Sequence, residues 1–248
     1  MLRNILRLHP NLACPEETHF YRQASPFGST EYVNFLKYNG TLIRHREMDK
    51  IGEDEFGRLL STSSTRRELI VQYMGLFAAR NKPQATRWFE KTPQHFYGLP
   101  LLANDFPGAR FIHIVRDPIS VASSLKTATA RSQGRVIGAS VLEACNYWNE
   151  AAGIIRTLKL ALGERLFEIR YEDFCADPQG GSSRILEFLD EPFDRIDGLP
   201  VREKSYSADP VLTAEEVAQV RNQCREGAAY YHYIIEPAAA TVLTTPVT

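Results

Sequence analysis

Residues 106-FPGARFIHIVRDPISVASS-124 indicate the fold class, because they have the pattern of a buried strand that turns directly into a helix. Its apolar run, Phe111–Val115, is typical of a strand covered on both faces in a parallel sheet. Asp117 and Pro118 match the N-cap and the first residue of a helix. Arg116 is therefore expected just past the carboxyl end of a strand, where ligands bind in open α/β sheets.

Two interpretations of Arg116 follow from this segment. In the first, its guanidinium, a helix N-terminus and the hydroxyls of Ser120, Ser123 and Ser124 converge where a phosphate would bind. In the second, Arg116 pairs with Asp117 or another carboxylate and only closes the strand end. The segment alone leaves both open.

The apolar pattern predicts a mixed series of helices and strands along the rest of the chain. Short strands are expected at about 87–90 and at 166–170. Arg66, Arg67 and Lys50 are expected at the solvated surface, and Trp148 in the packing. Helices are expected within 31–80, after Thr92-Pro93, over 141–162 and 183–189, and from a Thr213/Glu216 capping box to about 230.

Composition is that of an ordinary α/β enzyme. The 248 residues suit one domain, expected over 1–236, with a disordered tail at 237–248. A net charge of −1 without a basic stripe argues against nucleic-acid binding. Four scattered cysteines predict free thiols in a reducing compartment and no metal site. No apolar run approaches the roughly 18 residues of a membrane span, so a cytoplasmic location is expected.

Four motifs in a fixed order carry a family resemblance: EKTPQH at 90–95, the 106–124 unit, RYED at 170–173, and the helix after Asp177-Pro178. The set resembles the sulfotransferase superfamily, which uses 3'-phosphoadenosine-5'-phosphosulfate, and most nearly its tyrosylprotein sulfotransferase branch. The likeness covers about residues 1–194. It implies a P-loop-NTPase-like open parallel sheet flanked by helices, with that donor as co-substrate and no metal.

The family's first strand and its phosphosulfate-binding loop, a basic residue followed by Ser-Gly-Thr-Thr, have no counterpart here. Met1–Pro10 instead resembles the helix and His-Pro turn that follow that loop. Either an internal methionine was taken as the start, or the chain is a truncated relative. The first is favoured, because about five buried side chains at roughly 1.5–3 kcal/mol each would match much of the ~5–15 kcal/mol stability of a domain.

The resemblance also implies the catalytic residues. The segment 14-CPEET-18 is similar to a Cys-Gly-Glu-Glu-Thr segment of the tyrosylprotein branch, with Pro15 in place of glycine, and gives Glu17 the role of general base. Lys91 matches a lysine that contacts the oxygens of the transferring group. Without the resemblance, Glu16 and Glu17 would be exposed acids and Lys91 a surface charge.

Donor-binding residues follow in the same way. Arg116 and Ser124 match the pair that binds the 3'-phosphate, a role that suits the planar, permanently charged guanidinium. Tyr171 matches a tyrosine near the adenine, with core packing as the alternative. For the basic loop over the 3'-phosphate, Arg202 and Lys204 are only guesses.

Two histidines have competing interpretations. Cytosolic aryl sulfotransferases use a histidine two residues after a similar lysine, but Pro93 holds that place here. His95 is therefore expected in a polar structural role, with general base as the alternative. His113, inside the apolar strand, is expected to be a core histidine with its hydrogen bonds satisfied.

Together these features predict a sulfotransferase that moves a sulfuryl group to a hydroxyl, or an amine, of a small molecule or peptide. Assembly into a homodimer stays open. One alternative is a non-catalytic truncated relative that binds the nucleotide product or a protein partner. The other is a P-loop kinase, for which neither a Walker lysine nor a magnesium-binding acid is visible.

Overall fold

The computed structural model describes residues 1–22, 25–131, 140–192 and 211–233, and these fall into two compact units. The first unit comprises Met1–Phe111, Leu158–Phe167 and residues 178–192. The second comprises Ile112–Thr157, Glu168–Asp177 and residues 211–233. The tail at 237–248, Arg202 and Lys204 lie outside the described residues, and the domain bounds 1–236 stay a prediction.

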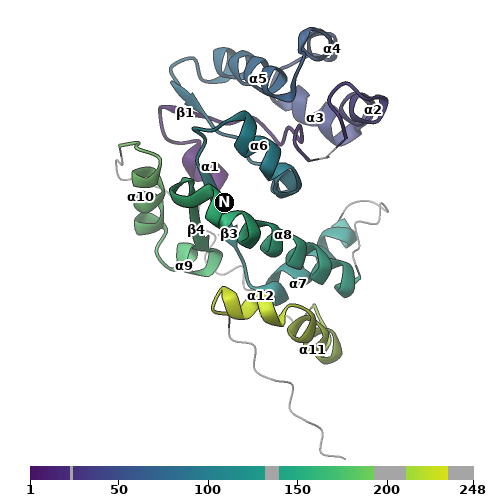
Figure 1. Ribbon diagram of the computed structural model, residues 1–248, viewed down its shortest axis with the longest axis vertical. Coiled ribbons are helices and arrows are strands. Elements are labelled where there is room, and N and C mark those ends of the chain that lie inside the picture. The colour runs from purple at the N-terminus through teal and green to yellow at the C-terminus, as the bar shows by residue number, and fades with distance from the viewer. Residues whose placement is uncertain (23–24, 132–139, 193–210, 234–248) are drawn as a thin grey trace, which may run out of the picture. The chain divides into compact units, whose positions relative to one another are not determined.

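Short strands are separated by one or more helices along the chain, as Figure 1 shows. The first unit contains β1 (Leu12–Ala13) and β2 (Arg87–Trp88), and the next strands along the chain are β3 (Phe111–Val115) and β4 (Leu166–Arg170). The helices up to β3 are α1 (Leu2–Leu6), α2 (Thr30–Tyr38), α3 (Gly40–Met48), α4 (Glu53–Thr62), α5 (Arg66–Asn81), η1 (Pro93–Gly98) and α6 (Leu99–Asp105). The later ones are α7 (Pro118–Arg131), α8 (Val141–Leu162), η2 (Gly163–Arg165), α9 (Tyr171–Ala176), α10 (Pro178–Phe188), α11 (Ala214–Gln223) and α12 (Arg225–Tyr230).

Two strand pairs are formed by the described residues. β1 and β2 run parallel, with Leu12 opposite Arg87 and Ala13 opposite Trp88. β3 and β4 form the other pair. The α/β class predicted from the sequence is confirmed, and α8 and β4 have the predicted bounds. The strand predicted at about 87–90 is shorter, at two residues.

The predicted helix caps are present. The Asp117 carboxylate accepts a hydrogen bond from the Ser120 amide at 2.8 Å at the start of α7. Thr213 and Glu216 form the predicted capping box of α11. The helix expected from there to about 230 is interrupted at Cys224, which ends α11 and precedes α12. These caps satisfy amides that the first helical turn leaves unpaired.

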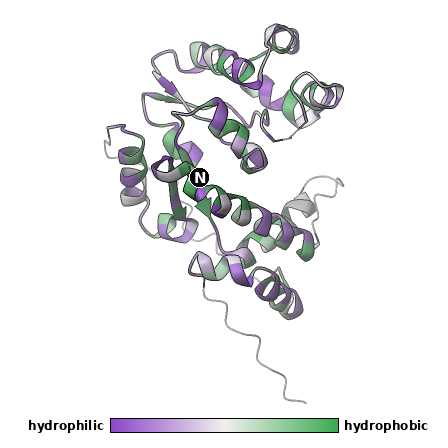
Figure 2. Ribbon diagram, viewed as in Figure 1, coloured by the Kyte–Doolittle hydropathy of each residue, from purple (hydrophilic) through white to green (hydrophobic). Residues whose placement is uncertain are grey.

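Each unit has its own hydrophobic core. The largest buried side chains of the first unit are aromatic, and Phe20 lies edge-on to Tyr73 at 5.3 Å between ring centres. Trp148 is buried in the core of the second unit, as predicted, and its Nε1 donates to the Arg116 carbonyl at 2.9 Å. Both colours of the hydropathy scale run along the long helices in Figure 2, as in amphipathic helices packed on a core.

One surface prediction is wrong. Arg67 and Lys50 are exposed, but Arg66 is only 9% exposed. Its guanidinium donates to the carbonyls of Phe20 and Ser25 and lies 4.8 Å from the Tyr32 ring centre. Backbone carbonyls and an aromatic face replace the water that a cation at this position would otherwise need.

No helix in the described ranges is both long and apolar enough to cross a bilayer. All four cysteines are free, and Cys14, Cys145 and Cys224 are buried. Burial raises the pKa of the Cys14 thiol to about 12, despite the nearby Arg7 guanidinium, which lowers it. The Cys14 thiol is therefore a poor nucleophile.

Candidate functional site

The two segments predicted to hold the catalytic residues begin at the carboxyl ends of two neighbouring parallel strands. The 14–18 segment follows β1, and the 90–95 segment follows β2. The ladder continues one step further, because the Phe89 amide donates to the Ala13 carbonyl at 2.9 Å. Parallel strands end at the same edge of a sheet, so the segments that follow them emerge side by side.

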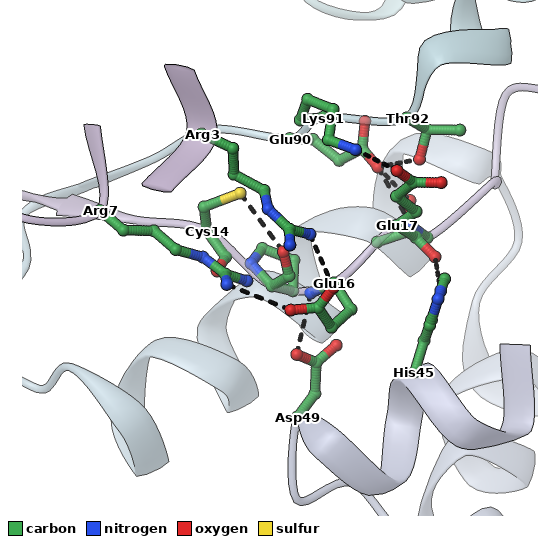
Figure 3. Close-up of polar contacts among 12 residues, drawn as sticks. Arg3, Arg7, Cys14, Glu16, Glu17, His45, Asp49, Glu90, Lys91 and Thr92 are labelled. Carbon is green, nitrogen blue, oxygen red and sulfur yellow. Dashed lines mark hydrogen bonds and ion pairs between the residues drawn. The ribbon is translucent and has the colours of Figure 1, made fainter. Parts of the chain in front are cut away.

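Glu17 and Lys91 form an ion pair at this edge (Figure 3). The Lys91 ammonium donates to Oε1 of Glu17, and the other oxygen, Oε2, lies 3.5 Å from Nε2 of His19. The Glu17 side chain is 24% exposed, so water and ligands can reach it. Burial raises the pKa of Glu17, but the hydrogen bonds from His19 and Lys91 outweigh burial and bring it down to about 2.

A series of hydrogen bonds joins the segment after Glu17 to the segment around Lys91. The amide and the hydroxyl of Thr18 each donate to Oε1 of Glu90 at 3.1 Å. The His19 amide donates to the Thr92 hydroxyl at 3.3 Å. Glu90 and Lys91 are adjacent, as are Glu17 and Thr18, so these bonds hold the two functional side chains within reach of each other.

Glu90 is the centre of this network. Its Oε2 lies 2.7 Å from Nδ1 of His95, and its Oε1 also accepts from the Thr92 hydroxyl. Burial raises the pKa of Glu90, but His95, Thr92 and the Thr18 amide together lower it below its ordinary value. A buried carboxylate with several donors is the arrangement in which a charge is tolerated inside a protein.

His95 has both ring nitrogens engaged. Nδ1 faces Glu90, and Nε2 accepts a hydrogen bond from the Tyr21 amide at 3.3 Å. The residue is 8% exposed. No ring nitrogen is left to take a proton from an acceptor in this arrangement, which favours the structural role over that of a base.

Glu16 and Glu17 point to different partners, although they are adjacent (Figure 3). Glu16 accepts from Arg3 at 2.6 Å and from Arg7 at 3.1 Å, and its amide donates to Asp49 at 2.9 Å. Its pKa is lowered by these arginines against the opposing effect of burial. Neither residue is the exposed acid of the alternative interpretation: Glu16 anchors the loop, and Glu17 is the more exposed of the two.

His45 of α3 completes the support of the loop. Its Nδ1 lies 2.9 Å from the Glu17 carbonyl, which accepts its hydrogen bond. His19 and His45 were not recognised as site residues from the sequence. Their positions depend on helix α3 and on the backbone turn at His19, and no sequence motif marks either.

The second unit contains the three predicted donor-binding residues. Arg116 directly follows β3 and Tyr171 directly follows β4, as the sequence predicts. The Arg116 guanidinium lies 4.7 Å from the centre of the Tyr171 ring, within the range of a cation–π contact. Ser124 lies on α7, eight residues after Arg116, and is exposed.

The carboxylate of Glu172 and the hydroxyl of Tyr233 support the strand end that precedes Arg116. Glu172 accepts from the Asp117 amide at 3.0 Å. The Tyr233 hydroxyl lies 2.6 Å from Glu172 and 3.1 Å from the Val115 carbonyl. Arg116 therefore does not pair with Asp117 as in the alternative interpretation, since the Asp117 carboxylate caps α7. The Nε of Arg116 is buried without a hydrogen-bond partner.

His113 is half-buried, not in the core as predicted, and one of its ring nitrogens has a polar partner. Its Nδ1 lies 3.2 Å from Glu168 of β4, and its ring lies 5.7 Å from that of Tyr231. Among the described residues, no group of three or more histidine, cysteine, aspartate or glutamate side chains could hold a metal ion.

A family model for the sulfotransferase family matches residues 1–195, and the chain belongs to this family of enzymes. The omega-hydroxy-beta-dihydromenaquinone-9 sulfotransferase Stf3 of Mycobacterium tuberculosis is 33% identical over 106 residues, which is 40% of this chain and 27% of that protein. The protein-tyrosine sulfotransferase of Drosophila melanogaster is 22% identical over 224 residues, 86% of this chain and 42% of that protein. The chain thus spans less than half the length of these relatives.

Solved structures agree in fold. The sulfotransferase domain of the Synechococcus PCC 7002 olefin synthase superposes with a TM-score of 0.60 at 16% identity, over 94% of this chain and 91% of that one. A sulfotransferase from Alicyclobacillus acidocaldarius gives 0.54 at 19% identity, over 94% and 90%. The predicted sulfotransferase fold is therefore confirmed.

Proposed function

We propose that the protein transfers a sulfuryl group from 3'-phosphoadenosine-5'-phosphosulfate to a hydroxyl acceptor by in-line displacement, with Glu17 as the general base. The observation that carries this proposal is the Glu17–Lys91 ion pair, which joins residues 74 positions apart in the sequence. A carboxylate that can take a proton and a cation that can bind anionic oxygens are the two groups that this reaction needs in one place.

The acceptor oxygen forms a bond to sulfur while the bond between sulfur and the phosphate oxygen of the donor breaks. The hydroxyl proton passes to Glu17, and adenosine 3',5'-bisphosphate leaves with the electron pair of the broken bond. Lys91 neutralises charge on the oxygens of the transferring group and holds them in line.

The low pKa of Glu17 favours donor binding before the acceptor proton is taken. At about 2 it is too low for an efficient base, which works best when its pKa is near the working pH. Lys91 is one of the two contacts that lower it, and anionic oxygens of a bound donor would compete for that ammonium. We therefore expect donor binding to raise the pKa of Glu17 before the acceptor proton is taken.

Arg116, Ser124 and Tyr171 are proposed to bind the 3'-phosphoadenosine part of the donor. The partnerless buried Nε of Arg116 supports an anion there, because a buried donor without a partner is costly. The Tyr171 ring restrains the Arg116 guanidinium, whose planar fork of N–H donors suits phosphate oxygens. The names of two relatives, a protein-tyrosine and an omega-hydroxy sulfotransferase, support a hydroxyl as the accepting group.

The test is an activity screen of the full-length protein. It is incubated with the donor and a panel of phenols, tyrosyl peptides, sugars and sterols, and sulfated product and adenosine 3',5'-bisphosphate are measured by mass spectrometry. We expect product with at least one acceptor, its loss in Lys91→Met, and its retention in Lys37→Met on α2. Binding of adenosine 3',5'-bisphosphate without any transfer would instead identify a non-catalytic relative.

A further inference from the structure

The two oxygens of the Glu17 carboxylate have different partners. Oε1 accepts from the Lys91 ammonium, while Oε2 lies 3.5 Å from Nε2 of His19. The side on which Lys91 lies is the side where the transferring group would be bound under the proposed function. Oε1 is therefore the oxygen that faces the transferring group, and Oε2 is the oxygen next to His19.

His19 is built into the loop in an unusual way. Its φ of 57° lies in the left-handed region, which side chains other than glycine rarely adopt. The residue is 6% exposed, and its amide is tied to the Thr92 hydroxyl. The surroundings hold this backbone conformation in place, which fixes the direction in which the side chain leaves the loop.

The ring of His19 is fixed by aromatic neighbours. It stacks on His45 at 6.3 Å between ring centres with 18° between the planes, and meets Phe35 edge-on at 6.4 Å. Its Nδ1 is buried without a hydrogen-bond partner. The tautomer with the proton on Nε2 avoids a partnerless buried N–H at Nδ1 and directs the N–H at Glu17.

We propose that His19 is the positioning residue of the Glu17 base: its Nε2–H holds Oε2, so that Oε1 stays aimed at the acceptor hydroxyl when Lys91 turns to the donor. This inference rests on the proposed function and adds a residue to it. The His45 contact with the Glu17 carbonyl fixes the backbone, and the His19 contact fixes the carboxylate plane.

A consequence for the pH dependence follows. The charged and titratable groups that face Glu17 are Lys91 and His19 at the carboxylate and His45 at the carbonyl, with Glu90 next in the chain to Lys91. His19 is one of the two groups whose hydrogen bonds lower the pKa of Glu17. Removing the Nε2 donor should therefore raise that pKa and move the acid limb of the pH–rate profile upward.

The experiment compares His19→Asn with His19→Gln in the full-length protein. Both side chains are polar, but only glutamine reaches far enough to place an N–H near the position of Nε2. We expect kcat to fall ~10–100-fold in His19→Asn, the scale of a small misplacement of a reacting group. In His19→Gln it should stay within about 3-fold of wild type, and the affinity for adenosine 3',5'-bisphosphate should hold in both.

His232 offers a matched control. It has a φ of 58° and is exposed, so His232→Asn makes the same change in the same backbone conformation elsewhere. We expect wild-type kcat from it. Equal kcat in both His19 variants, whether both normal or both low in folded protein, would overturn the inference. It would show that an N–H donor at the position of Nε2 has no effect on kcat.

A second readout does not need activity. The pKa of Glu17, followed by carboxyl ¹³C NMR, should rise in His19→Asn and return toward wild type in His19→Gln. An unchanged pKa in His19→Asn overturns the inference whatever the kinetics show. If instead this pattern appears in a protein that sulfates no acceptor, the His19 contact stands and the proposed function is what fails.

Discussion

The Arg116 guanidinium lies over the Tyr171 ring, 4.7 Å from the ring centre, so the first residues after β3 and β4 are in contact. The contact restrains the position of a cation at the end of a strand. Its Nε is buried and has no hydrogen-bond partner.

Arg116→Ala should abolish binding of adenosine 3',5'-bisphosphate and leave that of adenosine 5'-phosphate within about 2-fold, a free-energy change of less than ~0.5 kcal/mol. The reason is that the guanidinium is proposed to contact only the 3'-phosphate. Isothermal calorimetry measures both affinities. Arg44→Ala, an exposed arginine of α3, serves as the control and should bind both ligands normally. Equal losses for both ligands would show that Arg116 maintains the fold.

Glu90 should be a stability residue. Glu90→Leu removes the acceptor for Thr18, Thr92 and His95 and is expected to cost about 1–3 kcal/mol for each buried donor that is left without a partner. Urea denaturation followed by circular dichroism measures the loss. Glu187→Leu, an exposed glutamate of α10, is the control and should change stability by less than about 0.5 kcal/mol. A similar loss of stability in both variants would show that Glu90 contributes no more to stability than an exposed glutamate.

Glu17 should contribute to the acid sensitivity of the protein. Its folded pKa of about 2 is below the unfolded value of about 4.3. The folded state therefore binds fewer protons, and the stabilisation is complete above the unfolded pKa and is lost as the pH falls toward 2. Glu17→Gln should make the free energy of unfolding depend less steeply on pH between about 4.5 and 2. Urea titrations across this range measure that free energy in both proteins. The same pH dependence in wild type and Glu17→Gln would refute the ion pair.

Much of the fold follows from local pattern. The strand and helix on either side of Arg116 depend on a short apolar run and on the Asp117 cap, and both are present. Residues that are near in sequence set these elements. Glu17 and Lys91 were also predicted, but from a family resemblance and not from any local rule.

What the sequence could not predict depends on contacts between distant segments. The Thr18–Glu90 bonds join residues 72 positions apart, and the Tyr233 hydroxyl reaches the Val115 carbonyl across 118. Arg66 has the pattern of a surface residue because it lies in the polar run 61–68, yet its guanidinium donates to the carbonyls of Phe20 and Ser25, which are about 40 positions or more away in the sequence. The strained His19 has no sequence signal, because its conformation is imposed by these same long-range bonds.

The central claim is that Glu17, and not His95, is the general base. Turnover of sulfated product is measured for Glu17→Gln, His95→Ala and, as a control, Glu47→Gln at an exposed glutamate of α3, each in the full-length protein with saturating donor. Glu17→Gln should lower kcat by ~10²–10⁴ and keep donor affinity, since a positioned base contributes that much. His95→Ala should cost much less, and Glu47→Gln nothing. Normal turnover in Glu17→Gln together with an inactive His95→Ala would contradict the account and make His95 the base.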